Sequence, residues 1–556
     1  MSDVDGSMGR QAEGISRRSF LRWSATAASG VGLTALTTQA AWASDDQQGL
    51  RGRDGDGIVE ATIADLQAAM QSGELTAADL VDFYLDRIEG LNEDGPTLRA
   101  ILEVNSNARD VAHRLDEERR SGHVRGPLHG IAIVLKDNID TTDMMTTAGS
   151  LALAGPRPHQ DATVTGRLRD AGAVILAKAN LSEWANFRST RPCSGWSGRG
   201  RQGVNPYVLD RSPCGSSSGS AAAAAASLAT ATLGTETNGS IVCPSSVNGV
   251  VGIKPTVGLT SRAGVVPISH TQDTIGPICR TVADAATVLG ALTGADPRDA
   301  ATQNSVGHFF HDYRQFLDAG GLRGARIGIA RQFFGIDEHI DRIAEPAIQV
   351  LKDLGAVIVD PAVIPTLAQI NSSPTVTDLL LYEFKADVNA YLATRPDLAV
   401  HSLADLIAFN RAHAAQEMPY FLQQLFEQAQ AKGPLTDAQY LNDLATNRRL
   451  SRTEGLDKLF SDQNLDALFA PSRNPAWTID VISGDRSMGG SSTPAALAGY
   501  PLISVPAGHA FGELPVGVTF MGLAWSEPKL IKYAFAFEQA TRARKKPRFL
   551  RTLRLP

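Results

Sequence analysis

Apolar runs of four or five residues recur along the chain, separated by segments with a helical period. Ile131–Leu135 and Ala173–Ala177 have the length of buried strands. Around them, residues 107–120 and 163–170 place apolar side chains at helical spacing. Further strands are expected at 98–104, 230–233, 467–470 and 502–505, and a further helix at 220–227. This alternation predicts an α/β protein with a largely buried sheet.

Two helix starts carry a local signature near the beginning of the alternating region. Thr62 precedes Asp65 by three residues, and Thr76 precedes Asp79 in the same way. A hydroxyl followed three residues later by an acid can satisfy the free backbone N–H groups at a helix start. Both segments are therefore predicted to open helices.

Residues 340–470 depart from this alternation and are predicted to be mainly helical. Leu379–Tyr391 and Met418–Ala431 are examples. Such a stretch fits a helical layer inserted around a site, before the α/β pattern resumes at 466–540. We expect a single domain over residues 58–545.

The first 43 residues have the pattern of an export signal. Arg17 and Arg18 precede a mildly apolar run, and small residues flank Trp42 at its end. The pattern resembles a twin-arginine signal that is cut after Ala43. Glycines and threonines in the run disfavour the alternative, an amphipathic helix. The run is also too short and polar to be a good membrane span.

This signal predicts a partner and a location. The twin-arginine export machinery is an expected partner, and the mature protein is expected in the periplasm or outside the cell, with no stable membrane anchor. Residues 44–57 are polar and rich in glycine, and they are expected to form a flexible linker.

Composition and cysteine content narrow the classes of function. The chain has 556 residues and a formal net charge of -7. Nucleic acid is not an expected partner, because phosphate binding needs a clustered basic surface. No C-x-x-C pair occurs, so a thiolate zinc site is not expected. One disulfide is possible in an oxidising compartment, and the sequence leaves the pairing open among Cys193, Cys214, Cys243 and Cys279.

Three polar segments beside apolar runs are candidates for chemistry. Lys136 ends the run 131–135, and a lysine there must be paired or lose its proton, which would make it a competent base. Residues 214–220 (CGSSSGS) can wrap a ligand and cap the helix that follows. Residues 234–241 (GTETNGSI) can turn several backbone N–H groups toward an oxyanion. Singly, each has an ordinary alternative: a surface lysine, a flexible turn and a strand-to-strand turn.

The same residues permit a second interpretation. Gly215–Gly219 matches G-x-S-x-G, the nucleophile elbow of an α/β-hydrolase-type esterase, with Ser217 as the nucleophile. That interpretation needs a strand just before the turn, and 207–213 is a poor strand. It also needs a placed histidine, and neither His270 nor His509 has local support.

Together, the three polar segments resemble the amidase signature. The resemblance runs from Gly215 to Ser240, continues through Gly249–Thr256, and extends over about Ile58 to Ala540. It implies an α/β fold with a large mixed central sheet covered by helices on both faces. It also implies a serine hydrolase that cleaves carboxamide C–N bonds and needs no metal or organic cofactor.

The resemblance assigns roles to matching positions. The family's lysine closes an apolar G-[IV]-x-[IV]-x-x-K-D run, which implies that Lys136 is the base. The serine between the glycine turn and an isoleucine is Ser240, the implied nucleophile. Ser216 is implied to be the bridging serine, behind a cis peptide bond. Four backbone N–H groups are implied to form the oxyanion hole, those of Thr237, Asn238, Gly239 and Ser240.

One branch of the family is especially similar to this chain. Residues 180–188, 194–197 and 212–220 are similar to bacterial peptide amidases. This likeness implies removal of the C-terminal carboxamide of peptides, with an acyl-enzyme on Ser240 and release of ammonia. A broader aliphatic or aryl amidase of the same family is the alternative.

Other uses of the scaffold agree less well with the sequence. A transamidating subunit of a tRNA-charging complex shares the signature, but tRNA charging is cytoplasmic and the export signal argues against it. A non-catalytic binding protein would most simply lack a triad residue, and all three are present. A small-molecule or peptide amide is therefore the expected substrate. Cys214 and Asn238 stand where the family usually has glycine, and asparagine tolerates a left-handed backbone better than most residues.

Overall fold

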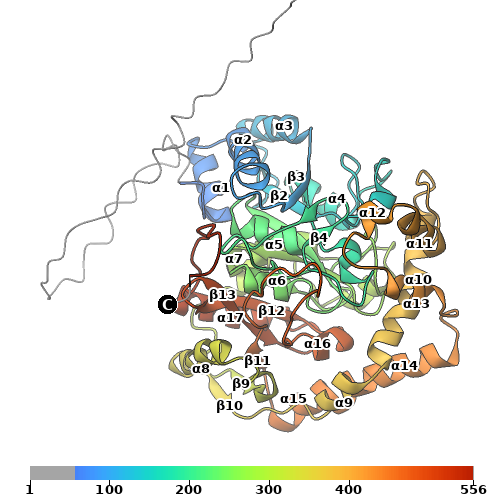
Figure 1. Ribbon diagram of the computed structural model, residues 1–556. Coiled ribbons are helices and arrows are strands. Elements are labelled where there is room, and N and C mark those ends of the chain that lie inside the picture. The colour runs from blue at the N-terminus through green and yellow to red at the C-terminus, as the bar shows by residue number, and fades with distance from the viewer. Residues whose placement is uncertain (1–56, 555–556) are drawn as a thin grey trace, which may run out of the picture. The chain divides into compact units, whose positions relative to one another are not determined.

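The predicted strands lie in one mixed sheet of eleven strands (Figure 1). The computed structural model describes residues 57–554. The order of strands across the sheet is β1-β3-β2-β6-β8-β7-β12-β13-β11-β9-β10. Their bounds are β1 Ile101–Val104, β2 Ala132–Lys136, β3 Val174–Ala179, β6 Ala231–Glu236, β7 Val251–Lys254, β8 Thr274–Cys279, β9 Arg326–Ile329, β10 Val357–Val359, β11 Ala467–Pro471, β12 Leu502–Ala510 and β13 Leu514–Met521. The remaining strands, β4 (Trp196–Ser197) and β5 (Arg201–Gln202), form a separate pair.

Two parallel groups flank an antiparallel centre. Strands β3, β2 and β6 run parallel to one another, as do β11, β9 and β10 at the other end. Strands β8, β7, β12 and β13 join the two groups through antiparallel pairs. Every residue of β2, β6 and β8 is buried, which requires cover on both faces of the sheet.

Helices supply that cover. Their bounds are α1 Ile63–Ser72, α2 Ala77–Ile88, α3 Ala108–Arg120, α4 Thr163–Asp170, α5 Ser218–Ala225, α6 Val242–Val247, α7 Val282–Leu292, α8 Glu338–Asp353, α9 Leu367–Ser372, α10 Thr375–Ala393, α11 Leu403–Ala412, α12 Ala414–Glu417, α13 Gln424–Gln430, α14 Ala438–Arg448, α15 Asp457–Gln463, α16 Thr493–Ala498 and α17 Glu527–Thr541. Helices α5 and α6 contact each other and the central strands, while α4, α7, α17 and α8 contact one another in series. The expected α/β architecture with a mixed central sheet is confirmed.

Local signals set the first helix starts correctly. Thr62 and Thr76 cap α1 and α2, each in a reciprocal capping box with the acid three residues on.

Two other predicted boundaries are wrong. The strand predicted from residue 98 begins at Ile101, because Arg99 has a φ of 50°, which a strand does not accommodate. The helix predicted at 220–227 covers 218–225, and Ser227 has a φ of 52°.

Residues 340–470 are mainly helical, as expected, and α9–α15 form an arc around one side of the sheet (Figure 1, yellow and orange). The helix predicted over 418–431 is wrong in its first half, because only α13 is helical there. Pro419 disfavours helical backbone at Met418. Arg188 then takes the carbonyls of Phe421 and Leu422 as acceptors, at 3.0 and 3.1 Å.

Predicted segments at the start of the chain fall outside the described residues. The predicted signal at 1–43 and all of the predicted linker except Gly57 lie outside the described residues. At the other end, the described chain continues past residue 545, where Leu550 pairs with Val208. Among residues 57–554, none of the helices has the length and apolar character needed to span a bilayer.

Candidate active site

Two neighbouring parallel strands bring the polar segments together. Strands β2 and β6 pair in parallel, with Leu135 opposite Leu233, so both end at the same edge of the sheet. Lys136 is the last residue of β2, and the 237–240 turn follows β6 directly. Ser216 stands just before α5, which contacts both strands. The three sequence segments therefore meet at one place.

Lys136 is fully buried beside Ser216. Its Nζ lies 2.8 Å from Ser216 Oγ and donates to Thr235 Oγ1 (2.8 Å) and the Thr235 carbonyl (3.3 Å). Burial lowers the pKa of Lys136 to about 7, because desolvation disfavours the ammonium form; Asp273 and Glu236 oppose the shift only in part. With two protons directed at Thr235, a neutral amine has its lone pair free to accept the Ser216 proton.

The two predicted serines are held through their backbones. The Gly215–Ser216 peptide bond is cis, as the resemblance implied. The Ser216 carbonyl accepts from Ser182 N–H (3.1 Å), and the Ser240 carbonyl accepts from Ser217 N–H (3.1 Å). Within the described residues, no hydrogen bond joins the two hydroxyls of Ser216 and Ser240. Ser240 lines a cavity of about 220 Å³, and this is where a substrate carbonyl can reach it.

The turn after β6 is shaped by a buried carboxylate that sequence reasoning missed. Glu236 accepts three backbone N–H groups, those of Gly239 (2.8 Å), Ile241 (2.7 Å) and Val242 (3.0 Å). Gly239 carries the left-handed conformation, with a φ of 82°. The turn therefore does not need a left-handed Asn238; instead, the Asn238 side chain accepts from Ser492 Oγ (2.6 Å).

The same contacts limit the oxyanion donors. Because Gly239 N–H donates to Glu236, that amide is not available to a ligand in this structure. The N–H groups of Thr237, Asn238 and Ser240 have no partner among the described residues. Those three remain the predicted donors for an oxyanion.

Replacing Glu236 by glutamine tests this arrangement. The carboxamide keeps one acceptor and presents N–H groups to backbone donors, so the turn must shift. We expect kcat for amide hydrolysis to fall by about 10- to 100-fold, because a displacement of about 1 Å at a reacting group is enough for that. KM should change much less. Wild-type kcat in a folded Glu236→Gln variant would contradict the proposed role.

A disulfide joins the two serine segments. Cys214 and Cys243 are bonded, while Cys193 and Cys279 are free and buried. Cys214 lies two residues before Ser216, and Cys243 three residues after Ser240. Cys214 also has a φ of 54°, which explains why glycine is usual at this position.

Removing this disulfide is expected to destabilise the fold. The bond closes a loop over a sequence separation of 29, so Cys214→Ala with Cys243→Ala should lower the free energy of unfolding by about 3 kcal/mol. Urea unfolding measures this loss, and Cys193→Ala is the matched control, since it removes a buried cysteine that is unpaired. Equal midpoints for the double variant and the control would contradict the expected loss.

Ser217, the alternative nucleophile, is placed differently. It is fully buried, its Oγ donates to the Thr235 carbonyl (3.1 Å), and it accepts from Thr235 N–H (3.2 Å). Residues 207–213 form only isolated bridges, so the strand that a nucleophile elbow requires is missing from this described part of the chain. These contacts give Ser217 a structural role in holding α5 to β6.

Comparison with known proteins decides the family. A model of the amidase family matches residues 79–531. The chain belongs to the amidase family. It is accordingly a hydrolase acting on amide C–N bonds.

Solved and curated relatives agree over most of this amidase. The structure of native peptide amidase from Stenotrophomonas maltophilia is 51% identical, with a TM-score of 0.83, and the match covers 88% of this chain and 99% of that one. The structure of an amidase family protein from Bacillus anthracis is 36% identical, with a TM-score of 0.80, covering 88% of this chain and 93% of that one. A probable amidase of Arabidopsis thaliana is 45% identical, covering 89% of this chain and 92% of the relative.

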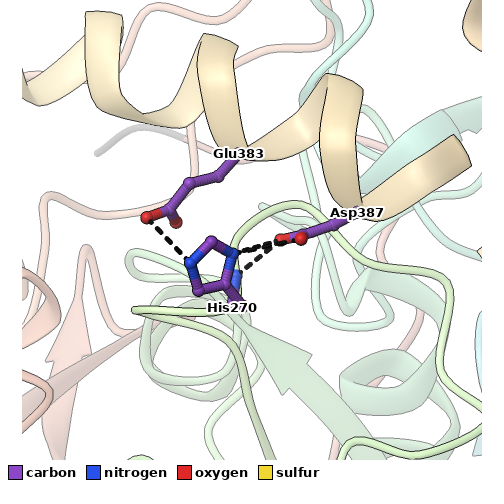
Figure 2. Close-up of side chains that lie close together, drawn as sticks. All are labelled: His270, Glu383 and Asp387. Atoms are coloured by element: carbon purple, nitrogen blue, oxygen red, sulfur yellow. Dashed lines mark hydrogen bonds and ion pairs between the residues drawn. The ribbon is translucent and has the colours of Figure 1, made fainter. Parts of the chain in front are cut away.

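A polar cluster joins helices α10 and α14 of the helical arc to the segment that carries His270. Figure 2 shows His270 between Glu383 and Asp387 of α10, with Nδ1 2.9 Å from Asp387 Oδ2 and Nε2 3.6 Å from Glu383 Oε1. Tyr440 of α14 donates to Glu383 Oε1 at 3.0 Å. His270, Glu383 and Asp387 lie close enough together to hold a metal ion. Each ring nitrogen of His270, however, already faces a carboxylate. The contacts favour an ion pair of protonated His270.

Two residues close in sequence to this ion pair line the Ser240 cavity: Ile268, two residues before His270, and Leu380 of α10. Burial lowers the pKa of His270, but the hydrogen bond to Asp387 and the charges of Glu383 and Asp387 outweigh burial and the nearby Arg262. The net effect is that the pKa is raised.

The raised pKa predicts a pH-dependent contribution to stability. It is fully present below the unfolded value of about 6.5 and is lost as pH rises through the higher folded value. His270→Gln should therefore lower the thermal midpoint more at pH 5.5 than at pH 9. A gap between wild type and variant that stays constant with pH would rule out the charged pair.

Proposed function

We propose that this amidase removes the C-terminal carboxamide of peptides through an acyl-enzyme on Ser240. The observation that carries the proposal is the buried Lys136, which lies 2.8 Å from Ser216 Oγ and has a pKa of about 7. A base of that pKa is partly neutral at physiological pH, as proton abstraction requires. The 51% identity to a peptide amidase supports the choice of substrate.

In the proposed mechanism, neutral Lys136 accepts the proton of Ser216 as Ser216 accepts that of Ser240. Ser240 Oγ attacks the carboxamide carbon, and the free N–H groups of the 237–240 turn stabilise the oxyanion. The intermediate collapses, the proton returns through Ser216 to the leaving nitrogen, and ammonia departs. Water then attacks the ester by the same proton route, releasing the peptide acid and restoring Ser240.

We also propose that the enzyme is exported by the twin-arginine route. The Cys214–Cys243 disulfide supports this proposal, because such bonds persist mainly in oxidising compartments. Cell fractionation of the full chain and of Arg17→Lys with Arg18→Lys tests it. Retention of only the variant in the cytoplasm is expected, and equal distribution of the two would refute the export route.

Ammonia release separates the substrate classes. We expect purified enzyme to release ammonia from an N-acetylated dipeptide carboxamide, while leaving the internal peptide bond intact, and to act far more slowly on propionamide. Preference for propionamide would keep the amidase chemistry but reject the peptide substrate. Cleavage of the internal bond would reject specificity for the terminal carboxamide.

A further inference from the structure

One cation in the wall of the Ser240 cavity lacks an acceptor. Arg473 follows β11 by two residues and lines the cavity together with Ser240. Within the described part of the chain its side chain makes no hydrogen bond or ion pair, and its Nε is a buried atom without a partner. The ring of Trp477 lies near it, with its centroid 5.9 Å from the guanidinium carbon.

Arg473 is half-buried and forms no side-chain hydrogen bond, whereas the fully buried arginines of the described chain all donate to oxygen acceptors, although each of them also keeps one nitrogen without a partner. Arg188 donates to Glu183 at 2.5 Å and to two main-chain carbonyls. Arg280 donates to the carbonyls of Ala229 and Ala61, at 2.9 and 2.7 Å. A desolvated donor without an acceptor is costly, and native proteins rarely keep one without reason. An acceptor supplied by a ligand would remove that cost at Arg473.

Asp485, the carboxylate among the residues that line this cavity, does not supply that acceptor. Asp485 accepts from Trp477 Nε1 at 3.0 Å, from Ser194 N–H at 3.0 Å, and from Ser194 Oγ at 2.5 Å. Its oxygens therefore accept hydrogen bonds from other residues of the cavity wall. Burial lowers the pKa of Arg473, and the charge of Asp485 opposes that shift without direct contact. The guanidinium remains a cation directed to the cavity.

Gly490 lies against the guanidinium of Arg473. A Cβ placed on Gly490 would lie 3.0 Å from Arg473 Nη1 and 3.1 Å from the Ser472 carbonyl oxygen, so a side chain there would require its neighbours to shift by a few tenths of an ångström. The cavity of about 220 Å³ is small beside the ~300–1,000 Å³ usual for ligand sites. Ser240 and Arg473 line this same cavity, so an acyl group attached to Ser240 would share it with the guanidinium.

We propose that Arg473 determines specificity by binding an oxygen acceptor on the acyl part of the substrate. This inference rests on the proposed function. When the leaving group is ammonia, every other substrate atom belongs to the acyl side. Two sources offer the same acceptor chemistry: the main-chain carbonyl before the amidated residue, and a carboxylate on the acyl group. Arginine suits both, because its planar guanidinium donates in a fixed geometry.

Three amides distinguish these sources. N-acetyl-phenylalaninamide carries the main-chain carbonyl. 3-Phenylpropanamide keeps the carbon skeleton of the phenylalanine residue but lacks the acetamido group, and succinamic acid carries a free carboxylate. For Arg473→Gln we expect kcat/KM on N-acetyl-phenylalaninamide to fall by about 10- to 100-fold, mainly through KM, since a hydrogen bond to a charged group is lost. Activity on 3-phenylpropanamide should change by less than about twofold. Arg473→Lys should recover part of the loss.

The exposed Arg486 provides the matched control, because it lies outside the cavity wall and Arg486→Gln removes the same charge. A loss confined to succinamic acid would support the proposal and assign the carboxylate as the acceptor. Equal losses on all three amides, or no loss on either acceptor-bearing amide, would overturn it.

A binding measurement keeps this test separate from the proposed function. In a Ser240→Ala background, calorimetry with N-acetyl-phenylalaninamide should show that Arg473→Gln raises Kd by the same factor. If wild-type enzyme released no ammonia from any of the three amides, the proposed function would fail, and the Kd comparison would still decide the role of Arg473. An unchanged Kd for N-acetyl-phenylalaninamide and for succinamic acid would overturn that role.

Discussion

Replacing Ser240 by alanine is expected to lower kcat for carboxamide hydrolysis by about 10⁴- to 10⁶-fold. The hydroxyl that would carry the acyl group is lost, while the Ser240 backbone keeps its bond to Ser217 N–H. The fold and substrate binding should therefore survive. Ammonia release under saturating peptide carboxamide measures the effect.

Ser217→Ala is the informative control for that experiment. Its hydroxyl forms hydrogen bonds only with Thr235 among the described residues, so its loss should cost much less activity than the loss of Ser240. The reverse ranking, with Ser217→Ala inactive and Ser240→Ala active, would support the esterase-type elbow instead.

Replacing Lys136 by methionine is expected to have the second large effect, a loss of about 10⁴-fold or more in kcat. Methionine fills much of the same buried space but cannot accept the Ser216 proton. An unchanged thermal midpoint with lost activity would separate catalysis from folding. Activity within about tenfold of wild type would contradict the role of base, because general-base catalysis contributes about 10²- to 10⁴-fold.

The pH dependence of kcat/KM for the wild-type enzyme tests Lys136 as the base without a mutation. Because burial lowers the pKa of Lys136 to about 7, the neutral form is the minor species below that pH. We expect kcat/KM to fall about tenfold per pH unit below 7 and to level off above it. A flat profile between pH 5 and 8 would argue against lysine as the base.

Much of the fold was predictable, because it depends on local pattern. The apolar run before Lys136 and the capping threonines Thr62 and Thr76 act through neighbours in sequence. The helix expected over 418–431 failed at its start because Pro419 and a distant arginine, Arg188, determine the backbone there.

The site was predictable only where its motifs are contiguous. Lys136, Ser216 and the 237–240 turn lie in recognisable segments. Arg473 and the pair of His270 with Asp387 do not, because their roles arise from contacts between segments far apart in sequence. The pairing of Cys214 with Cys243 was equally invisible, since four cysteines leave several pairings open. Glu236 alone had a usable signal, an acid directly before the glycine turn.

Mass spectrometry can detect an acyl-enzyme on Ser240 during turnover. Wild-type enzyme is quenched with acid during turnover of N-acetyl-phenylalaninamide, digested, and sequenced by fragmentation. We predict an N-acetyl-phenylalanyl group on Ser240, absent from Ser240→Ala treated in parallel. An acyl group on Ser217 or another residue, together with turnover that survives in Ser240→Ala, would contradict Ser240 as the nucleophile.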